Sequence, residues 1–111
     1  MNGKSPTKKQ TDLGGALKAL DSAFVLFYAS WCPFSQKFLP IFKEYSRENM
    51  SKNCISIKID DREDICKKYS ISVYPTVLFF EKGSVSKRLD GIAGRGLSEK
   101  MLTDFVGKCE G

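Results

Sequence analysis

Residues 23–45 read AFVLFYASWCPFSQKFLPIFKEY, and this stretch decides the fold. Its first six residues form a continuous apolar run, which is typical of a strand buried on both faces of a sheet. After Cys32 the apolar side chains recur at helical spacing, which predicts a helix from about residue 33 to residue 49. Pro40 falls inside this helix and is expected to kink it, because proline removes one backbone hydrogen bond. The sequence therefore predicts a buried strand that leads into a long helix, with Cys32 at the junction.

The rest of the chain alternates between helical and strand patterns on either side of this unit. The further elements expected are helices over residues 13–20, 62–69 and 97–106, and strands over 54–59, 76–80 and 85–89. The order is α-β-α-β-α-β-β-α, with no internal repeat. It predicts a three-layer α/β/α domain with a mixed central sheet, parallel where helices intervene and antiparallel at the last hairpin.

Length and charge limit the classes of protein to consider. The chain has 111 residues, which indicates one domain, and 41% of them are hydrophobic, which excludes a disordered protein. Residues 1–10 are polar and aperiodic, so we expect a disordered basic arm before a domain over residues 11–111. The arm carries three lysines, which leaves a net charge of only +2 on the domain and does not favour nucleic-acid binding.

No segment resembles a secretory signal or a membrane span. The apolar run that starts at Ala23 is about a third of the length needed to cross a bilayer, and no small-x-small cleavage site follows it. The four cysteines are Cys32, Cys54, Cys66 and Cys109; they form no C-x-x-C pair, and the chain has no histidine. We therefore expect a cytoplasmic, monomeric protein without a disulfide framework, a metal or a cofactor.

Cys32 is the candidate reactive residue because it lies where a strand ends and a helix begins. The free backbone N–H groups and the dipole of a helix N-terminus favour a thiolate, which is the attacking species in disulfide exchange. Pro33 suits the first turn of the helix. Position alone fits a small buried hydrophobic side chain equally well. A second signal is Pro75, which directly precedes a strand, where a tight and often cis turn is expected.

Taken together, these features resemble the thioredoxin family. Its members carry a strand, a Trp-Cys-x-x-Cys helix start, a proline five residues after the second cysteine, and a cis-proline before a later strand. The residues that carry the resemblance here are Phe27 to Cys32, Pro40, Tyr74-Pro75-Thr76, Gly83 and Gly91. The match extends over roughly residues 12–108. It implies a thioredoxin-like fold and a thiol–disulfide oxidoreductase that acts on disulfide-containing proteins and receives electrons from an upstream reductase.

The resemblance also implies roles for individual residues. Cys32 is the implied nucleophile, and Pro75 is the implied cis-proline beside it. The residues implied to line the substrate groove are Trp31, Pro33, Tyr74, Gly91 and Ile92. The residue before the cis-proline offers its backbone groups to an extended peptide, which binds as a short added strand.

Two positions depart from the family pattern. Ser35 stands where the family has its second, resolving cysteine, so Cys32 would stay joined to its partner until an external thiol attacked. Ser35 can donate a hydrogen bond to the thiolate, and it is either native or an engineered substitution. Leu26 stands where the family often has a buried carboxylate that assists proton transfer.

Two other functions fit the same sequence. The stretch Cys32-Pro33-Phe34-Ser35 also resembles the Cys-Gly-Phe-Ser signature of monothiol glutaredoxins, which bind glutathione and can hold an iron–sulfur cluster. That family's Gly-Gly-x-Asp glutathione signature is missing near Gly91. The other function is a non-enzymatic docking module, in which Cys32 has ordinary reactivity. The remaining cysteines are expected to be structural rather than resolving.

Overall fold

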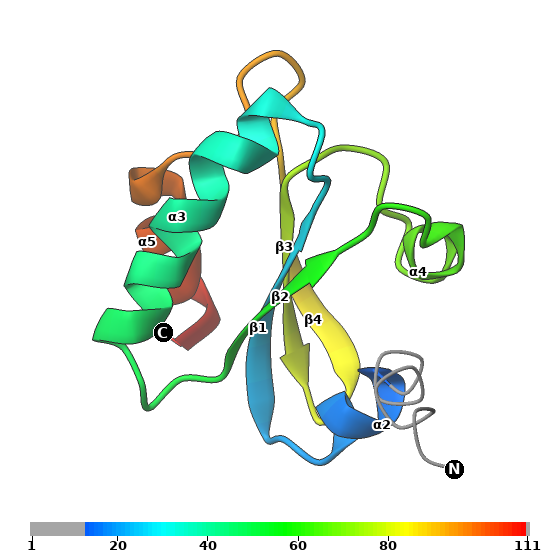
Figure 1. The fold of residues 1–111 in the computed structure, drawn as a ribbon. Helices are drawn as coiled ribbons and strands as arrows, with labels where there is room; N and C mark the ends of the chain where they lie inside the picture. The colour runs from blue at the N-terminus through cyan, green and yellow to red at the C-terminus, as the bar shows by residue number, and fades with distance from the viewer. Residues whose placement is uncertain (1–12, 111) are drawn as a thin grey trace, which may run out of the picture.

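The computed structural model describes residues 13–110, so the basic arm expected over residues 1–10 lies outside the described residues. The elements, in chain order, are α2 (Leu13–Lys18), β1 (Ser22–Tyr28), α3 (Pro33–Glu48), β2 (Cys54–Lys58), α4 (Glu63–Lys68), β3 (Thr76–Glu81), β4 (Ser84–Asp90) and α5 (Glu99–Glu110) (Figure 1). This is the order that the sequence predicts, and Pro40 lies inside α3 as expected.

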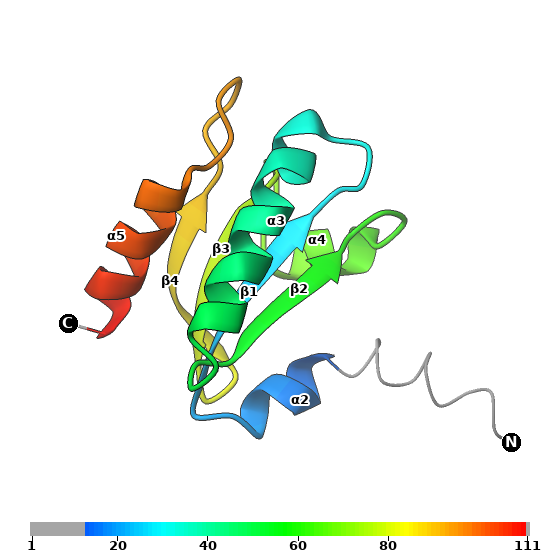
Figure 2. The same cartoon turned by 60° about the vertical axis from the view of Figure 1, so that its left-hand side comes forward.

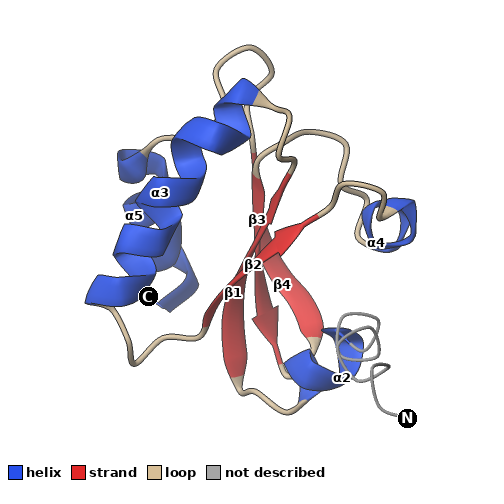
Figure 3. Cartoon of the chain, in the orientation of Figure 1, coloured by secondary structure: helices blue, strands red, loops and turns tan. Residues whose placement is uncertain are grey.

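The four strands form one mixed sheet in the order β2-β1-β3-β4. Strand β1 runs parallel to β2 and antiparallel to β3, and β3 and β4 form an antiparallel hairpin. Helices α3 and α5 cover one face of the sheet, and α2 and α4 lie on the other (Figures 1 and 3). The three-layer α/β/α architecture with a mixed central sheet is thereby confirmed.

The direction of β3 differs from the expectation that strands are parallel wherever a helix intervenes. Helix α4 separates β2 from β3, yet β3 runs antiparallel to β1 and hence to β2. The reason is the length of α4: six residues span only about 9 Å, which is too short to carry the chain back along the sheet. Strand β3 therefore begins at the end of the sheet where β1 finishes, and its first residue, Thr76, pairs with Phe27.

Strand β1 divides the apolar interior into two layers because its side chains alternate between the two faces. On the α2 and α4 side, Ala23, Val25 and Phe27 pack among Leu17, Ile65, Ile71, Leu78 and Phe80. On the α3 and α5 side, Phe24 and Leu26 pack among Phe38, Phe42, Val77, Phe79, Leu102, Phe105 and Val106. The continuous apolar run of the sequence is thus a strand buried on both faces.

The turn from β1 to α3 and the loop after β4 lie at the same end of the sheet (Figure 2). Since β3 also starts there, three connections that are distant in sequence meet at this end. Among the described residues, no helix combines the length and apolar character needed to cross a bilayer.

We expect Phe42→Ala to lower the free energy of unfolding by about 3–5 kcal/mol, because it leaves a cavity between α3 and the sheet. Phe42 is 1% exposed and its ring lies 6.4 Å from that of Phe38, centroid to centroid. Urea denaturation measures the loss. The matched control is Met50→Ala, which removes a side chain that is 85% exposed and should change stability by less than about 0.5 kcal/mol. Equal losses in both variants would contradict this layer assignment.

Candidate active site around Cys32

Cys32 is the N-cap residue of α3. Its backbone is extended, with φ of −92° and ψ of 122°, and its carbonyl accepts the first helical hydrogen bond from the Gln36 N–H at 2.9 Å. Pro33 occupies the first turn, where its missing N–H costs nothing. The sulfur therefore lies at the positive end of a 16-residue helix. Cys32 is only 8% exposed, so a partner must come into close contact to reach the thiol.

The turn before Cys32 is held by side chains from outside it. The carboxylate of Asp60 accepts hydrogen bonds from the Ser30 N–H, at 2.9 Å, and from the Ser30 hydroxyl. The Gln36 side chain donates to the Ser30 carbonyl at 2.8 Å. The bonds from Ser30 lower the pKa of Asp60, so the carboxylate is ionised at neutral pH. Asp60 and Gln36 thus fix the segment that presents Cys32.

Ser35 lies one helical turn after Cys32 and is completely buried. Its hydroxyl oxygen accepts a hydrogen bond from the Ala29 N–H at 3.1 Å. This contact joins the end of β1 to the start of α3. The bond from Ser35 to Cys32 that the sequence suggests is not among the contacts of the described residues. Ser35 therefore has a structural partner of its own.

The Tyr74–Pro75 segment faces Cys32 from the start of β3. The peptide bond between Tyr74 and Pro75 is cis, and Pro75 is buried. The Cys32 thiol points to the Tyr74 carbonyl, with sulfur and oxygen 3.8 Å apart. The Thr76 hydroxyl donates to the Val73 carbonyl at 2.8 Å and closes the turn around the proline. A backbone carbonyl from residue 74 therefore lies beside the sulfur.

Gly91 brings the loop after β4 onto this segment. A Cβ at residue 91 would lie 2.4 Å from the Pro75 carbonyl oxygen, so only glycine permits this close approach. Further along, Ile92 and Gly96 exchange two backbone hydrogen bonds, of 3.0 and 2.7 Å. Gly96 packs against Phe34, where a Cβ would lie 2.8 Å from that of Phe34. The loop over residues 91–96 therefore reaches from Pro75 to the start of α3.

Two segments near Cys32 carry exposed apolar side chains. Trp31 is 64% exposed and Ile92 is 44% exposed, which is unusual for large apolar side chains. The Trp31 ring makes an edge-to-face contact with the Tyr74 ring, with centroids 5.8 Å apart. Contacts thus link Cys32 to Tyr74, Tyr74 to Trp31, and Pro75 to Gly91, whereas Ile92 and Pro33 are exposed; the substrate-binding role of these residues stays a prediction.

The other three cysteines occupy different surroundings, and all four are free thiols. Burial raises the pKa of Cys54, at the start of β2, and raises the pKa of Cys109, in α5, to about 11. The Cys66 sulfur lies 3.8 Å from the Tyr74 hydroxyl, a contact that sequence reasoning missed. Burial, together with this contact, raises the pKa of Tyr74. Among the described residues, none of the three forms a disulfide with Cys32, although Cys66 packs against the same apolar cluster as Cys32.

Two chemical absences bear on the site. At the position where the family often has a buried carboxylate, this chain has Leu26, which is completely buried among the apolar residues on the α3 side. Over residues 13–110, no group of three or more histidine, cysteine or acidic side chains could hold a metal ion.

The site residues that the sequence did not reveal are Asp60 and Gln36. Asp60 follows β2, and β2 is parallel to β1, so the two strands end side by side. That parallel pairing is the signal that could have placed Asp60 next to Ser30.

Comparisons with known proteins point to one family. A family model described as thioredoxin matches residues 8–105. Endoplasmic reticulum resident protein 44 from Mus musculus is 42% identical over 98 residues, which is 81% of this chain and 23% of that protein. Thioredoxin-1 from Caenorhabditis elegans is 30% identical over 76 residues, or 68% of this chain and 66% of that protein. The chain therefore spans about a quarter of the first relative and two thirds of the second.

Solved structures show the same fold at lower identity. Plasmodium falciparum thioredoxin superposes with a TM-score of 0.78 at 21% identity, covering 89% of this chain and 92% of that chain. Fasciola hepatica thioredoxin superposes with a TM-score of 0.76 at 22% identity, covering 88% and 91%.

We expect iodoacetamide at pH 7 to modify Cys32 before any other cysteine. Cys32 lies at the start of α3, whereas a pKa of about 11 leaves roughly one Cys109 thiol in 10,000 ionised at this pH. Modification of Cys109 should therefore grow only as the pH rises toward 11. Peptide mass spectrometry over time measures the order, and a urea-unfolded sample, in which all four thiols react alike, is the control. If Cys66 or Cys109 carries the first adduct, the assignment of Cys32 as nucleophile is wrong.

Proposed function

We propose that this chain, which belongs to the thioredoxin family, is a thiol–disulfide oxidoreductase whose nucleophile is Cys32. The observation that carries the proposal is the position of its sulfur, at the start of α3 and 3.8 Å from the Tyr74 carbonyl. A helix start stabilises the thiolate, and a cis-proline segment beside it supplies backbone groups that an extended peptide can pair with.

The first step is an exchange of one sulfur–sulfur bond for another. The Cys32 thiolate attacks one sulfur of a substrate disulfide, and a bond forms between that sulfur and Cys32. The original bond breaks, and the second substrate sulfur leaves as a thiolate that takes a proton from water. The number of disulfide bonds is unchanged, so no oxidant is consumed. The product is a mixed disulfide between Cys32 and the substrate.

Ser35 prevents the chain from completing the reaction alone. A hydroxyl oxygen cannot attack the mixed disulfide to form a sulfur–sulfur bond, whether Ser35 is native or substituted. Release therefore requires an external thiol, from a reductase or from glutathione, which attacks the mixed disulfide and regenerates the Cys32 thiolate. Leu26 offers no carboxylate to assist proton transfer, so water serves that role.

The remaining cysteines are poorly placed to act as the resolving thiol. Cys54 and Cys109 lie in or against the layer on the α3 and α5 side, where burial raises the pKa of both. The Cys66 sulfur contacts the Tyr74 hydroxyl, whereas the Cys32 sulfur contacts the Tyr74 backbone carbonyl, so the two thiols bind different groups of the same residue. The proposed chemistry is therefore that of a monothiol.

Disulfide-containing proteins are the proposed substrates. An extended segment would pair with the backbone of Tyr74, and its side chains would pack on Trp31, Pro33 and Ile92. We propose that the protein acts as a monomer. The cytoplasmic location expected from the sequence stays a prediction, to be tested by microscopy of the tagged protein, because one relative is named for the endoplasmic reticulum.

We expect the chain to form a long-lived mixed disulfide with a peptide disulfide, and Ser35→Cys to release it. A thiol one helical turn after Cys32 lies within bridging reach, and an intramolecular thiol can act at effective concentrations of about 10⁵ M or more. Turnover of a disulfide substrate with a recycling reductant should therefore rise by at least about tenfold. Cys32→Ser is the control and should abolish both adduct and turnover.

Three results would contradict this mechanism. Equal turnover with serine and cysteine at position 35 would mean that the resolving step does not involve this position. Undiminished adduct formation by Cys32→Ser would assign the chemistry to another cysteine. A chain that binds partners equally well after Cys32→Ser, and forms no adduct before it, would be a docking module.

A further inference from the structure

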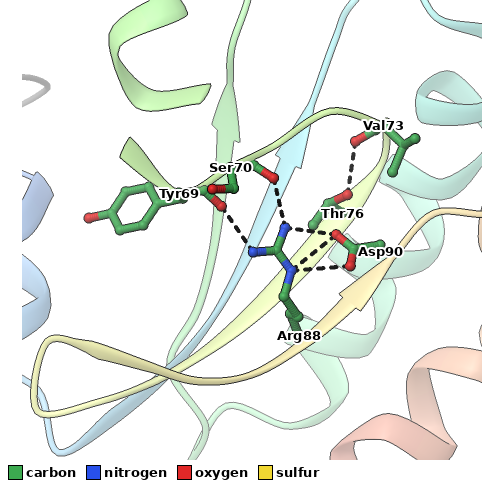
Figure 4. A network of polar contacts seen from close by, with 6 residues as sticks. All are labelled: Tyr69, Ser70, Val73, Thr76, Arg88 and Asp90. Carbon is green, nitrogen blue, oxygen red and sulfur yellow. Dashed lines mark hydrogen bonds and ion pairs between the residues drawn. The ribbon is translucent and has the colours of Figure 1, made fainter. Parts of the chain in front are cut away.

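Arg88 makes the most extensive set of polar contacts among the described side chains (Figure 4). From β4, its guanidinium group donates one hydrogen bond to the Tyr69 carbonyl and another to the Ser70 carbonyl, both at 3.0 Å. The same group pairs with the Asp90 carboxylate through contacts of 2.8, 3.1 and 3.2 Å. Arg88 thus connects the last strand of the sheet to the segment that follows α4.

The two carbonyls that Arg88 binds belong to Tyr69, the C-cap residue of α4, and to Ser70, the residue that follows it. The last carbonyls of a helix lack partners within it and need donors from elsewhere. Ser70 has a φ of 55°, so the chain leaves α4 through a left-handed residue. A planar guanidinium can donate to both carbonyls and to a carboxylate at once, which a lysine ammonium cannot do with the same geometry. This end of α4 therefore has a specific requirement for arginine.

The segment that starts at this helix end leads directly to the active site. Tyr74 lies four residues after Ser70, and its carbonyl is the group 3.8 Å from the Cys32 sulfur. The other end of the segment is held at Thr76, which pairs with Asp90 across the sheet. Arg88 and its partner Asp90 therefore act at both ends of the segment from residue 69 to residue 76.

Asp90 has a second connection to the site through the chain itself. It precedes Gly91, whose backbone packs on the Pro75 carbonyl. The ion pair with Arg88 therefore sits next to the two contacts that set the position of Pro75: the β3–β4 pairing and the close approach of Gly91.

We propose that Arg88 is a positioning residue for the Tyr74–Pro75 segment. By holding the end of α4 against β4, it fixes the backbone that a substrate peptide pairs with, and it does so without touching the sulfur. The inference rests on the proposed function of Cys32, because it assigns Arg88 to peptide recognition at that site.

The effect of Arg88 is expected to be local. The Tyr69 ring packs 5.8 Å from Phe27 and 5.4 Å from Phe80, centroid to centroid, so the end of α4 keeps its apolar anchor without Arg88. Beyond Ser70, Ile71 and Pro75 are buried and Tyr74 packs against the same apolar cluster, but Ser72 is exposed and Val73 is only half-buried. Loss of the guanidinium should therefore loosen residues 72–75 while the sheet remains intact.

The test compares Arg88→Ala and Arg88→Lys with Lys87→Ala. Lys87 is the adjacent residue of β4 and is exposed, and because side chains alternate along a strand it points to the opposite face of the sheet from Arg88, so it is a matched control. One measurement is amide hydrogen exchange of residues 70–76. The other is the rate at which Cys32 forms an adduct with a peptide disulfide and with hydroxyethyl disulfide, which is too small to use the groove.

We expect Arg88→Ala to speed amide hydrogen exchange in residues 70–76 by about tenfold and to slow the reaction of Cys32 with the peptide disulfide by about fivefold. The reason is the loss of the two hydrogen bonds to the Tyr69 and Ser70 carbonyls. The reaction with hydroxyethyl disulfide should change by less than about twofold, since the sulfur is not contacted. Arg88→Lys should behave like Arg88→Ala, because lysine keeps the positive charge but lacks the planar guanidinium that donates to both carbonyls and the carboxylate. Lys87→Ala should match the unmodified chain.

Several outcomes would overturn the proposal. Unchanged exchange in both Arg88 variants would show that the segment is held by other contacts. Full activity of Arg88→Lys would reduce the role of Arg88 to its charge, and an equal loss with both disulfides would indicate general destabilisation. If the unmodified chain forms no adduct with the peptide, the proposed function of Cys32 is wrong, and so is the role of Arg88 in peptide recognition. If only the hydrogen exchange is unchanged in the Arg88 variants, the positioning role of Arg88 alone is wrong.

Discussion

The turn between β1 and α3 depends on hydrogen bonds that reach it from outside, and the geometry of the Cys32 site depends on this turn. Asp60 holds the N–H and hydroxyl of Ser30, Gln36 holds the Ser30 carbonyl, and Ser35 accepts from the Ala29 N–H. A backbone that leaves a buried strand must find such partners or lose stability, because unpaired polar groups are costly away from water. The hydrogen bonds with Asp60, Gln36 and Ser35 also set the angle at which the chain enters α3 at Cys32.

The second determinant is the end of the sheet at which β3 starts. A longer helix in place of α4 could have returned the chain to the opposite end and made β3 parallel. Because α4 spans only six residues, Thr76 pairs with the end of β1, and Pro75 arrives beside Cys32. The antiparallel direction of β3 is therefore a condition for the site, and the network of Arg88 and Asp90 lies where this connection is made (Figure 4).

Much of this arrangement could be predicted from local patterns. The apolar run of β1 and the helical spacing of α3 identified both elements and placed Cys32 between them. The expected direction of β3 was wrong, because strand direction depends on where a connection ends and not on the presence of a helix. Asp60 and Arg88 were missed for a related reason: their partners lie 30 and 18 or 19 positions away in sequence. Contacts of that kind leave no periodic signal.

Ser35 shows how a structural and a chemical requirement meet at one position. Its oxygen is a good acceptor for the Ala29 N–H, whereas the sulfur of a cysteine is a weak one. A cysteine at this buried position can resolve a mixed disulfide, but it loosens the bond between the end of β1 and the start of α3. A serine keeps that bond and leaves the mixed disulfide intact. Serine at this position therefore favours the hydrogen bond that holds the turn before Cys32 over the ability to resolve a mixed disulfide, in agreement with the proposed monothiol chemistry.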